Sequence, residues 1–570
     1  MSPASSARQA PRLVSLAVAT LAFAPAMRAT ETDYSAAIRE FEAVAADELK
    51  RGLVSGFSIA LVDDQRLVHA AGYGFADKRR AVPAARDTVY RCGSISKLFT
   101  ACATMQLAER GHLDIDQPLS MSLPFFRIVS PFADAPPITL RQLMCHRAGL
   151  VRESPVGSYF DPTEPTPAQT VASLADCVMP HPPNQVTKYS NSGVTIVGEA
   201  VAAAAGMSFE KYQDEHLLRP LGMNRSAWRL NAKLKPHLAK GYLPVADGRG
   251  GFHEMESPHF ELGTIPAGNL YTTAEDLARF VMCLLAKGGA GGKQVLKPRT
   301  LEKMFTVQFT GETNGFGLGF SIGAHRGRKT VGHSGAVYGF TSSLVALPGE
   351  KLGVIVLCND DIATGPVKRL GNAALDLMLR AKFDEPLPAP AKPVDLSAAE
   401  LAAFAGEFES ASYWAEIKLT GRQLSANVSG QLMTWTPVGP LRFEAEGRVA
   451  HESPVVFKAG KDGGMDSFTL MGQTFTRVDP ARIQPVPQSW RRFLGSYGPE
   501  FIPLIVSERH GRLYAMTENM FDYRLTPVNQ TAFLMPPGMY VDEQLVFQCD
   551  AKGRPHTAVL ASIPLRRAGR

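Results

Sequence analysis

Alternating apolar and polar positions mark short strands near both ends of the first two thirds of the chain. Phe57 to Val62 and Arg66 to Gly74 alternate on either side of the polar turn Asp63-Asp64-Gln65, which predicts a strand pair. Farther along, Phe340 to Leu347 and Leu352 to Leu357 predict two neighbouring strands joined by a Pro-Gly turn. The pattern therefore predicts strands that frame this part of the chain.

Helical patterns lie between these strands. Ala101 to Arg110 is followed by Gly111, and Val194 to Ala205 is followed by Gly206. Glycine directly after an apolar periodic segment is a common helix stop. Strands at both ends with helices between them favour an α+β domain over residues 30–383.

The composition changes after this domain. Residues 384–395 (DEPLPAPAKPVD) form a proline-rich linker. Beyond it, short alternating segments occur in two copies, whose landmarks recur 89 or 90 positions later: Phe404-Ala405-Gly406-Glu407-Phe408 and Phe493-Leu494-Gly495-Ser496-Tyr497, Gly421-Arg422 and Gly511-Arg512, Pro437-Val438 and Pro527-Val528, Phe443 and Phe533, Val456-Phe457 and Val546-Phe547. We expect two small antiparallel β-barrels, over residues 396–480 and 481–570, because closure removes exposed strand edges.

The N-terminus resembles a targeting segment. Arg8 and Arg12 precede an apolar run from Leu13 to Ala24, and small residues follow up to Ala29. This is typical of a secretory signal peptide, here residues 1–29, so we expect an exported protein, periplasmic or secreted. An uncleaved anchor is the alternative, although the run is short for a bilayer, and no later segment predicts a transmembrane helix in the mature chain.

The composition argues against several classes of function for this protein. The chain has 570 residues, a formal charge of +6 and scattered basic residues, so it lacks the basic stripe of a nucleic-acid-binding protein. Its seven cysteines are far apart and no zinc-binding spacing occurs, so we expect neither a disulfide framework nor a metal, and no cofactor.

A Ser-x-x-Lys pattern is the first candidate for chemistry. If Ser94 opens a helix, Lys97 lies on the same face, and a desolvated lysine can take the proton of a serine nucleophile. The helix N-terminus also offers backbone N–H groups to an oxyanion. Ser208 and Lys211 have the same spacing, but Ser208 follows Gly206 and resembles a helix N-cap, a structural interpretation that also fits Ser94.

Two further short patterns follow along the chain. Tyr189-Ser190-Asn191 combines a tyrosine that can relay protons with an asparagine that can orient a lysine or a substrate amide. His333-Ser334-Gly335 precedes a strand, and its small residues let a substrate backbone lie close, whereas His325 lies in a basic turn. A buried tyrosine and a structural histidine are the simpler interpretations of either pattern alone.

Taken in order, Ser94-x-x-Lys97, Tyr189-x-Asn191 and His333-x-Gly335 resemble the three motifs of serine β-lactamases and penicillin-binding proteins. The branch with class C β-lactamases, D-aminopeptidases and related esterases is the most similar. Three flanking segments agree: Cys145 to Leu150, Pro266 to Leu270, and Tyr338-Gly339-Phe340. The resemblance implies a catalytic domain with an antiparallel sheet flanked by helices plus an all-helical region, and members of this branch can also carry C-terminal lipocalin-like β-barrels.

The resemblance implies a role for each residue. Ser94 would form an acyl-enzyme, Lys97 and Tyr189 would transfer protons, and Asn191 would orient Lys97 and the substrate. The backbone N–H groups of Ser94 and Ala336 would form the oxyanion hole. Which of Lys97 and Tyr189 is the general base stays open. Cys92 lies outside the motif, so burial is its expected role.

One position departs from many penicillin-recognising members, which have lysine where this chain has His333. A histidine is mostly neutral at pH 7, so the substitution favours the subset that resembles D-aminopeptidases and other small-peptide or amide hydrolases. The resemblance to this subset implies substrates that include peptides with D-residues, such as linearised microcystin. An esterase and a D,D-carboxypeptidase or β-lactamase are alternatives, as is a binding protein with a vestigial hydrolase domain. Residues 152–170 are expected to loop near the site, and the oligomeric state is left open.

Overall fold

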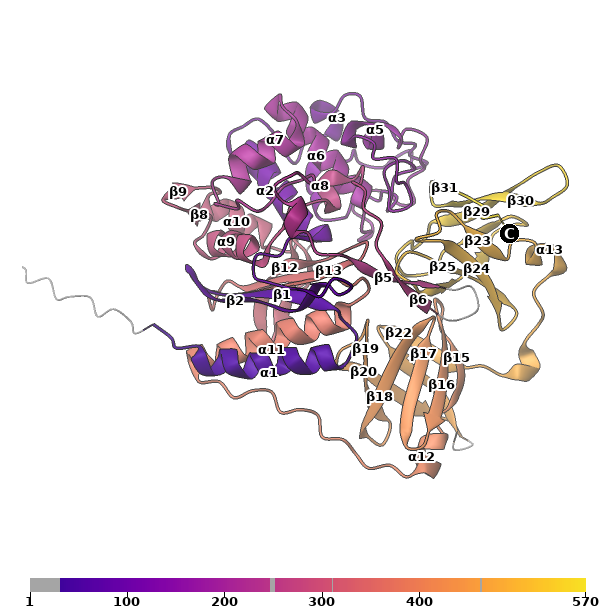
Figure 1. Cartoon of the computed structure of the whole chain (residues 1–570). Coiled ribbons are helices and arrows are strands. Elements are labelled where there is room, and N and C mark those ends of the chain that lie inside the picture. Colours follow the sequence, from indigo (N-terminus) through magenta and orange to yellow (C-terminus); the bar gives the residue numbers. More distant parts are fainter. Residues whose placement is uncertain (1–30, 247–251, 310, 462–463, 570) are drawn as a thin grey trace, which may run out of the picture.

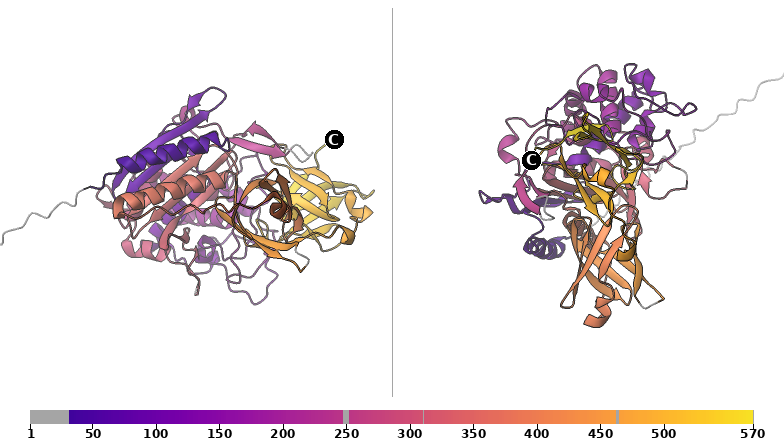
Figure 2. Two further views of the ribbon diagram at one scale, coloured as in Figure 1. Left: turned by 90° about the horizontal axis from the view of Figure 1, so that it is seen from below. Right: turned by 90° about the vertical axis from the view of Figure 1, so that its right-hand side faces the viewer.

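The computed structural model describes residues 31–246, 252–309, 311–461 and 464–569. The segment predicted to be a signal peptide lies outside them. A large mixed α and β part is followed by two smaller β parts, which both lie against the same side of it (Figure 1 and Figure 2). Within the described residues no single helix is long and apolar enough to cross a membrane, and one bent pair, Asn191–Ala205 with Phe209–Leu218, reaches that length only together.

An eight-stranded sheet forms the centre of the first part, in the order β10-β11-β12-β13-β14-β1-β2-β3. Its strands are β1 (Gly56–Asp63), β2 (Arg66–Asp77), β3 (Val82–Pro83), β10 (Gly315–Phe316), β11 (Ser321–His325), β12 (Arg328–Val337), β13 (Phe340–Leu347) and β14 (Leu352–Cys358). All neighbours pair antiparallel. Strands from the two ends of this part meet in the pairing of β1 with β14, which confirms the predicted α+β arrangement.

Helices cover both faces of this sheet (Figure 1). The helices α1 (Ser35–Lys50) and α11 (Thr364–Phe383) pack together on one face, and α9 (Ala274–Leu285) contacts the other. The helical region lies beyond α9 and contains α2 (Ser96–Glu109), α3 (Leu119–Ser122), α4 (Leu140–Met144), α5 (Pro167–Ala172), α6 (Asn191–Ala205), α7 (Phe209–Gln213), α8 (Ile265–Gly268) and α10 (Pro298–Met304). This region holds the candidate nucleophile against the sheet.

The helix α2 begins five residues earlier than the pattern predicted. Every residue from Ser96 to Leu107 is buried, so the helix has no polar stripe that would mark its first turn. The end of α6 agrees with the prediction, because Gly206 adopts the left-handed conformation with φ 65° that favours glycine after a helix.

The first C-terminal part is a closed barrel of eight strands. They are β15 (Gly406–Glu409), β16 (Trp414–Thr420), β17 (Gln423–Val428), β18 (Gln431–Gly439), β19 (Arg442–Gly447), β20 (Ser453–Ala459), β21 (Met465–Leu470) and β22 (Gln473–Arg477). Its core is aromatic, with Trp435 and Phe468 packed at 5.2 Å between ring centroids. No helix or strand lies between Phe383 and α12 (Ala398–Ala402), where the proline-rich linker was predicted.

The second C-terminal part differs from the closed barrel that we predicted. It has a four-stranded sheet, β23 (Gly495–Tyr497), β24 (Leu504–Arg509), β25 (Arg512–Met516) and β26 (Asp522–Arg524), and a five-stranded sheet, β27 (Thr526–Pro527), β28 (Ala532–Leu534), β29 (Gln544–Cys549), β30 (Pro555–Leu560) and β31 (Ile563–Arg566). One bridge, between Tyr497 and Arg567, joins the two sheets. The strand that matches β18 is interrupted at Leu525, between β26 and β27, although Pro437 at the position matching Pro527 does not interrupt β18.

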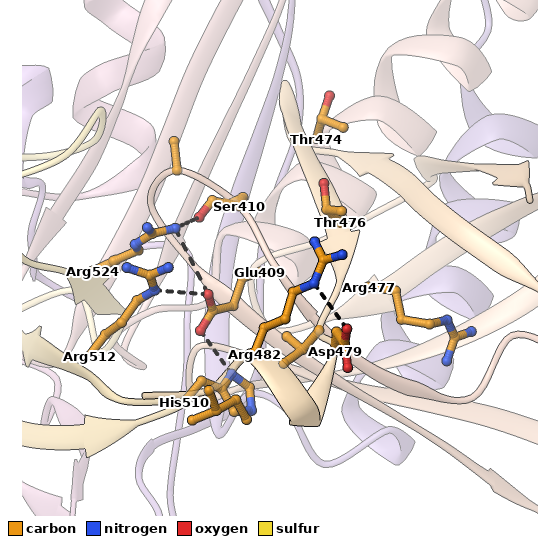
Figure 3. Close-up of a pocket in the computed structure, with 13 residues that line it drawn as sticks. Glu409, Ser410, Thr474, Thr476, Arg477, Asp479, Arg482, His510, Arg512 and Arg524 are labelled. Atoms are coloured by element: carbon orange, nitrogen blue, oxygen red, sulfur yellow. Dashed lines mark hydrogen bonds and ion pairs between the residues drawn. The ribbon is translucent and has the colours of Figure 1, made fainter. Parts of the chain in front are cut away.

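The two C-terminal parts meet through polar contacts around Glu409 (Figure 3). The carboxylate of Glu409 lies 2.8 Å from His510 Nδ1, 3.2 Å from Arg512 Nε and 3.9 Å from Arg524. A cavity of about 420 Å³ opens beside this cluster. Farther into the contact, Trp414 Nε1 donates to Asp522 (2.9 Å) and Ser412 Oγ donates to the carbonyl of Pro537 (2.7 Å). These hydrogen bonds hold the second C-terminal part against the barrel.

Candidate active site

Ser94 lies in a tight turn between strand and helix. The strand β4 (Tyr90–Arg91) leads into a 3₁₀ turn, Gly93–Ile95, and α2 follows directly. Gly93 has φ +54°, a backbone conformation that favours glycine. Ser94 is partly exposed although the residues on both sides of it are buried, so the turn presents its hydroxyl to the site.

Lys97 is buried and fully hydrogen-bonded. Its side chain is 1% exposed, and Nζ donates to Ser94 Oγ (3.0 Å), Asn191 Oδ1 (2.7 Å) and the carbonyl of Ala267 (2.7 Å). Burial lowers the pKa of Lys97 well below its usual value, although the charge of Glu153 opposes this. Because the lowered pKa favours loss of a proton from Nζ, the neutral amine can accept a proton from Ser94 Oγ.

Tyr189 reaches the same hydroxyl from the other side. Its Oη donates to Ser94 Oγ at 2.8 Å, and Lys97 Nζ lies 4.9 Å from the centre of its ring. Burial raises the pKa of Tyr189 to about 12, although Ser94 and Arg152 oppose the shift. Ser190 caps α6 by accepting from Gly193 N (2.9 Å), which places Tyr189 and Asn191 on either side of the helix start.

The third pattern lies on β12, next to the turn that carries Ser94. A Cβ at Gly335 would lie 2.1 Å from the carbonyl oxygen of Cys92 and 3.0 Å from the amide nitrogen of Ser94. A Cβ at Gly93 would lie 2.7 Å from the amide nitrogen of Ala336. Only glycine fits at both positions, and the close approach brings the amides of Ser94 and Ala336 to one place. Paired amides of this kind can stabilise an oxyanion.

His333 lies at the edge of this group. Its ring centroid is 6.2 Å from that of Tyr189 and 6.3 Å from that of Phe316. Burial and the charge of Lys97 lower the pKa of His333 to about 4, so the ring is neutral at pH 7. Its Nε2 is buried without a hydrogen-bond partner among the described residues. A neutral ring offers no fixed charge to a substrate carboxylate.

The sequence patterns indicated two further segments near this group but did not single out the residues that contact it. His146 accepts from Ser190 N (3.2 Å) and stacks on Tyr189 at 4.2 Å between centroids. Glu153 is fully buried and accepts from Asn191 Nδ2, and burial, opposed by Arg152, raises its pKa to about 7. Tyr159 Oη donates to the carbonyl of Ala336 (2.8 Å). Glu153 and Tyr159 belong to the segment 152–170, so the expected loop does lie beside the site.

The competing patterns have structural roles. Ser208 caps α7 by accepting from Lys211 N at 3.3 Å. His325 pairs with Asp376 at 2.9 Å. Cys92 is buried, and burial raises the pKa of its thiol to about 12, which keeps it protonated. Over the part of the chain that the structure covers, no cluster of three or more His, Cys, Asp or Glu side chains has the arrangement of a metal site.

Known proteins resemble this chain mainly over its first two thirds. A family model described as Beta-lactamase matches residues 39–378. "Protein flp" of Staphylococcus aureus (strain MRSA252) is 24% identical over 322 residues, which cover 56% of this chain and 62% of that protein. The chain thus aligns with less than two thirds of the length of this relative.

Two solved structures share the fold. The octameric penicillin-binding protein homologue from Pyrococcus abyssi has a TM-score of 0.54 at 22% identity, covering 85% of this chain and 99% of that one. The D-amino acid amidase from Ochrobactrum anthropi SV3, complexed with L-phenylalanine amide, has a TM-score of 0.52 at 22% identity, covering 61% of this chain and 99% of that one. The likeness to the first extends beyond residue 378 into the C-terminal parts.

Proposed function

The chain belongs to the β-lactamase family, and from this premise we propose that it is a serine hydrolase that cleaves amide or peptide bonds of small peptides through an acyl-enzyme on Ser94. One observation carries the proposal: Ser94 Oγ lies 3.0 Å from Lys97 Nζ and 2.8 Å from Tyr189 Oη. A hydroxyl between a buried amine and a phenol has a base for its proton and a donor for the leaving group.

The proposed reaction proceeds in two steps. Ser94 Oγ attacks the substrate carbonyl while its proton passes to Lys97 or Tyr189, and the amides of Ser94 and Ala336 stabilise the oxyanion. The leaving amine takes a proton from the same pair of groups, and the acyl group stays on Ser94. Water then attacks the acyl-enzyme, transfers its proton back through these groups and releases the acid. Asn191 holds Lys97 in place through its 2.7 Å hydrogen bond.

The neutral ring of His333 supports amide or peptide substrates over β-lactams, because it supplies no cation for a carboxylate. The fold shared with a D-amino acid amidase supports the same choice and suggests small substrates, including those with D-residues. Ester hydrolysis by the same Ser94 is the nearest alternative. We also propose that residues 1–29 direct export, which fractionation of cells expressing the full chain would test.

Covalent labelling with a fluorophosphonate probe tests the proposed nucleophile. We expect the wild-type protein to be labelled once, at Ser94, and Ser94→Ala to lose both labelling and hydrolysis of amino-acid p-nitroanilides. Ser208→Ala is the matched control, because Ser208 has the same spacing to a lysine but caps α7. Labelling that survives in Ser94→Ala would overturn the assignment, and a panel of L- and D-amino-acid amides and esters would identify the substrate class.

A further inference from the structure

The second C-terminal part contacts the segments that carry Tyr189 and Asn191. The contacts come from residues 535–543, between β28 and β29, which we name the docking loop, and from Glu518 after β25. The docking loop is braced internally, because Met535 N donates to the carbonyl of Glu543 (2.8 Å) and Glu543 N donates to that of Tyr540 (3.0 Å). A braced loop can hold its partners in a defined position.

The docking loop makes a buried ion pair beside the candidate proton donor. Lys188 directly precedes Tyr189, and its Nζ lies 2.6 Å from Glu543 Oε1. The two side chains are only 1% and 2% exposed. Nζ also donates to the carbonyl of Val541 (2.8 Å), while the backbone N–H of Lys188 donates to the carbonyl of His146 (2.8 Å). The backbone just before Tyr189 is thus held from both sides.

Arg152 links the same carboxylate to Asn191. Its backbone N–H donates to Glu543 Oε1 (3.1 Å), and its carbonyl accepts from Asn191 N (2.9 Å). Its guanidinium lies 5.3 Å from the centre of the Tyr189 ring and 3.8 Å from Glu518. Tyr540 Oη holds Glu518 at 2.9 Å. A short path of contacts therefore connects the docking loop to both residues of the second motif.

The charges at this contact are complementary. The hydrolase part brings Arg152 and Lys188, and Arg152 also lies 3.5 Å from a buried carboxylate of the same part, Glu153. The second C-terminal part supplies Glu518 and Glu543, which are 9% and 4% exposed. Removing one partner of a buried pair leaves an uncompensated charge, which the chain relieves by moving it towards water. Such a movement would displace Tyr189 or Asn191, and small displacements of catalytic groups can cost about a hundredfold in rate.

We propose that the second C-terminal part is a component of the active site, in which Glu543 and Glu518 are positioning residues that hold Tyr189 and Asn191 against Ser94 and Lys97. The inference rests on the proposed function, because it assigns the two carboxylates to the geometry of that reaction. It gives this part of the chain a role in the rate of acylation rather than in contact with the substrate.

Glu543→Gln in the full-length chain tests the proposal. We expect kcat to fall about ten- to a hundredfold with KM nearly unchanged, and the rate of Ser94 labelling by a fluorophosphonate to fall by the same factor. Circular dichroism and the thermal midpoint report the folded fraction. Glu508→Gln is the matched control in the same part, because it breaks an ion pair with Arg491 that is 3.4 Å long and largely exposed, so its kcat should not change.

The double variant Lys188→Gln/Glu543→Gln separates positioning from folding. It leaves a neutral amide pair and no unpaired charge, so it should fold well and recover much of the lost kcat. Wild-type kcat per folded molecule in Glu543→Gln would overturn the proposal, as would equal kcat in the single and double variants. If the wild-type protein itself is not labelled at Ser94, the proposed function fails instead, so the two failures are distinguishable.

Discussion

The two C-terminal repeats dock on the hydrolase part with corresponding loops, yet they reach different places. The first repeat uses residues 448–452, between β19 and β20, and the second uses the docking loop, 535–543, between β28 and β29. The landmarks Phe443 and Phe533 precede these loops, and the Val-Phe pairs at 456–457 and 546–547 follow them. The loop at this position of the repeat therefore makes different contacts in the two copies.

The first loop holds the rim of the sheet. Arg448 donates to the carbonyls of Leu53 (2.7 Å) and Asp361 (2.6 Å), next to the ends of β1 and β14. Beside it, Arg369 of α11 bridges Glu446 of the barrel and Glu48 of α1. These contacts join the barrel to the scaffold of the sheet.

The second loop is longer and meets the segments around Tyr189 and Asn191. The repeated apolar landmarks thus preserve the strands of each copy, whereas the loop between them determines which segment of the hydrolase part that copy contacts. Four experiments, in order of decreasing effect, test this distinction.

Removing the cation at each contact should separate stability from catalysis. Lys188→Met and Arg369→Met each break a buried ion pair, so each should lower the free energy of unfolding by about 3–5 kcal/mol. Only Lys188→Met should also lower kcat per folded molecule, by about ten- to a hundredfold. Urea denaturation and active-site titration measure the two effects. Equal kcat losses in both variants would erase the distinction between the repeats.

The two contacts should respond to pH in opposite directions. Burial, opposed by Arg152, raises the pKa of Glu153 from 4.5 to about 7, so its contribution to stability is present below about pH 4.5 and lost as pH rises through 7. Burial alone would raise the pKa of Glu446, but hydrogen bonds from His451 and Glu452 and the charge of Arg369 hold it below 4.5. Its contribution is present above about pH 4.5 and lost as pH falls through the lowered value.

Denaturation of the wild-type protein, Glu153→Gln and Glu446→Gln across this range checks the signs. The stability of the wild type relative to Glu153→Gln should fall from about pH 5 to about pH 8. Its stability relative to Glu446→Gln should rise as pH increases from the lowered pKa of Glu446 to about pH 5, and stay level above it. Parallel slopes for the two variants would contradict the assignment.

Arg448→Ala should weaken the first contact alone. Two carbonyl groups lose their donor, at a cost of about 1–3 kcal/mol in the free energy of unfolding. We expect kcat per folded molecule to stay at the wild-type value, because these contacts lead to the rim of the sheet. A loss of kcat that persists after correction for the folded fraction would show that the barrel also acts on the site.

Phe501→Ala should have the smallest effect. Phe501 of the second repeat packs at 5.6 Å from Phe260 and 5.7 Å from Tyr338, whereas the first repeat has Ala411 ninety positions earlier. Aromatic pairs contribute about 0.5–1.5 kcal/mol each, so we expect the free energy of unfolding to fall by about that amount per lost pair, with kcat and KM unchanged. A fall in kcat as large as that of Lys188→Met would assign Phe501 to positioning as well.

Much of the hydrolase part could be predicted because its signals are local. Strand alternation anticipated β1, β2, β13 and β14 within a few residues, and the first two short motifs contain the two side chains that hydrogen-bond to Ser94 Oγ, Lys97 and Tyr189. The first turn of α2 was missed because burial on all sides leaves no periodic pattern. The second barrel was predicted as closed, but the interruption at Leu525 divides its strands into two sheets.

The strands, the repeat and the motif that joins Ser94 to Lys97 could be predicted from the sequence, because each depends on residues close together in the chain. The contact of Glu543 with Lys188, at 2.6 Å and across more than three hundred positions, is visible only in the tertiary structure. A pairing over that separation depends on how complete domains pack, and a lone glutamate in a loop gives no local sign of it. The pairing of Ser94 with Lys97 can thus be predicted from neighbouring residues. The contacts that hold the segments of Tyr189 and Asn191 form only when the domains pack together.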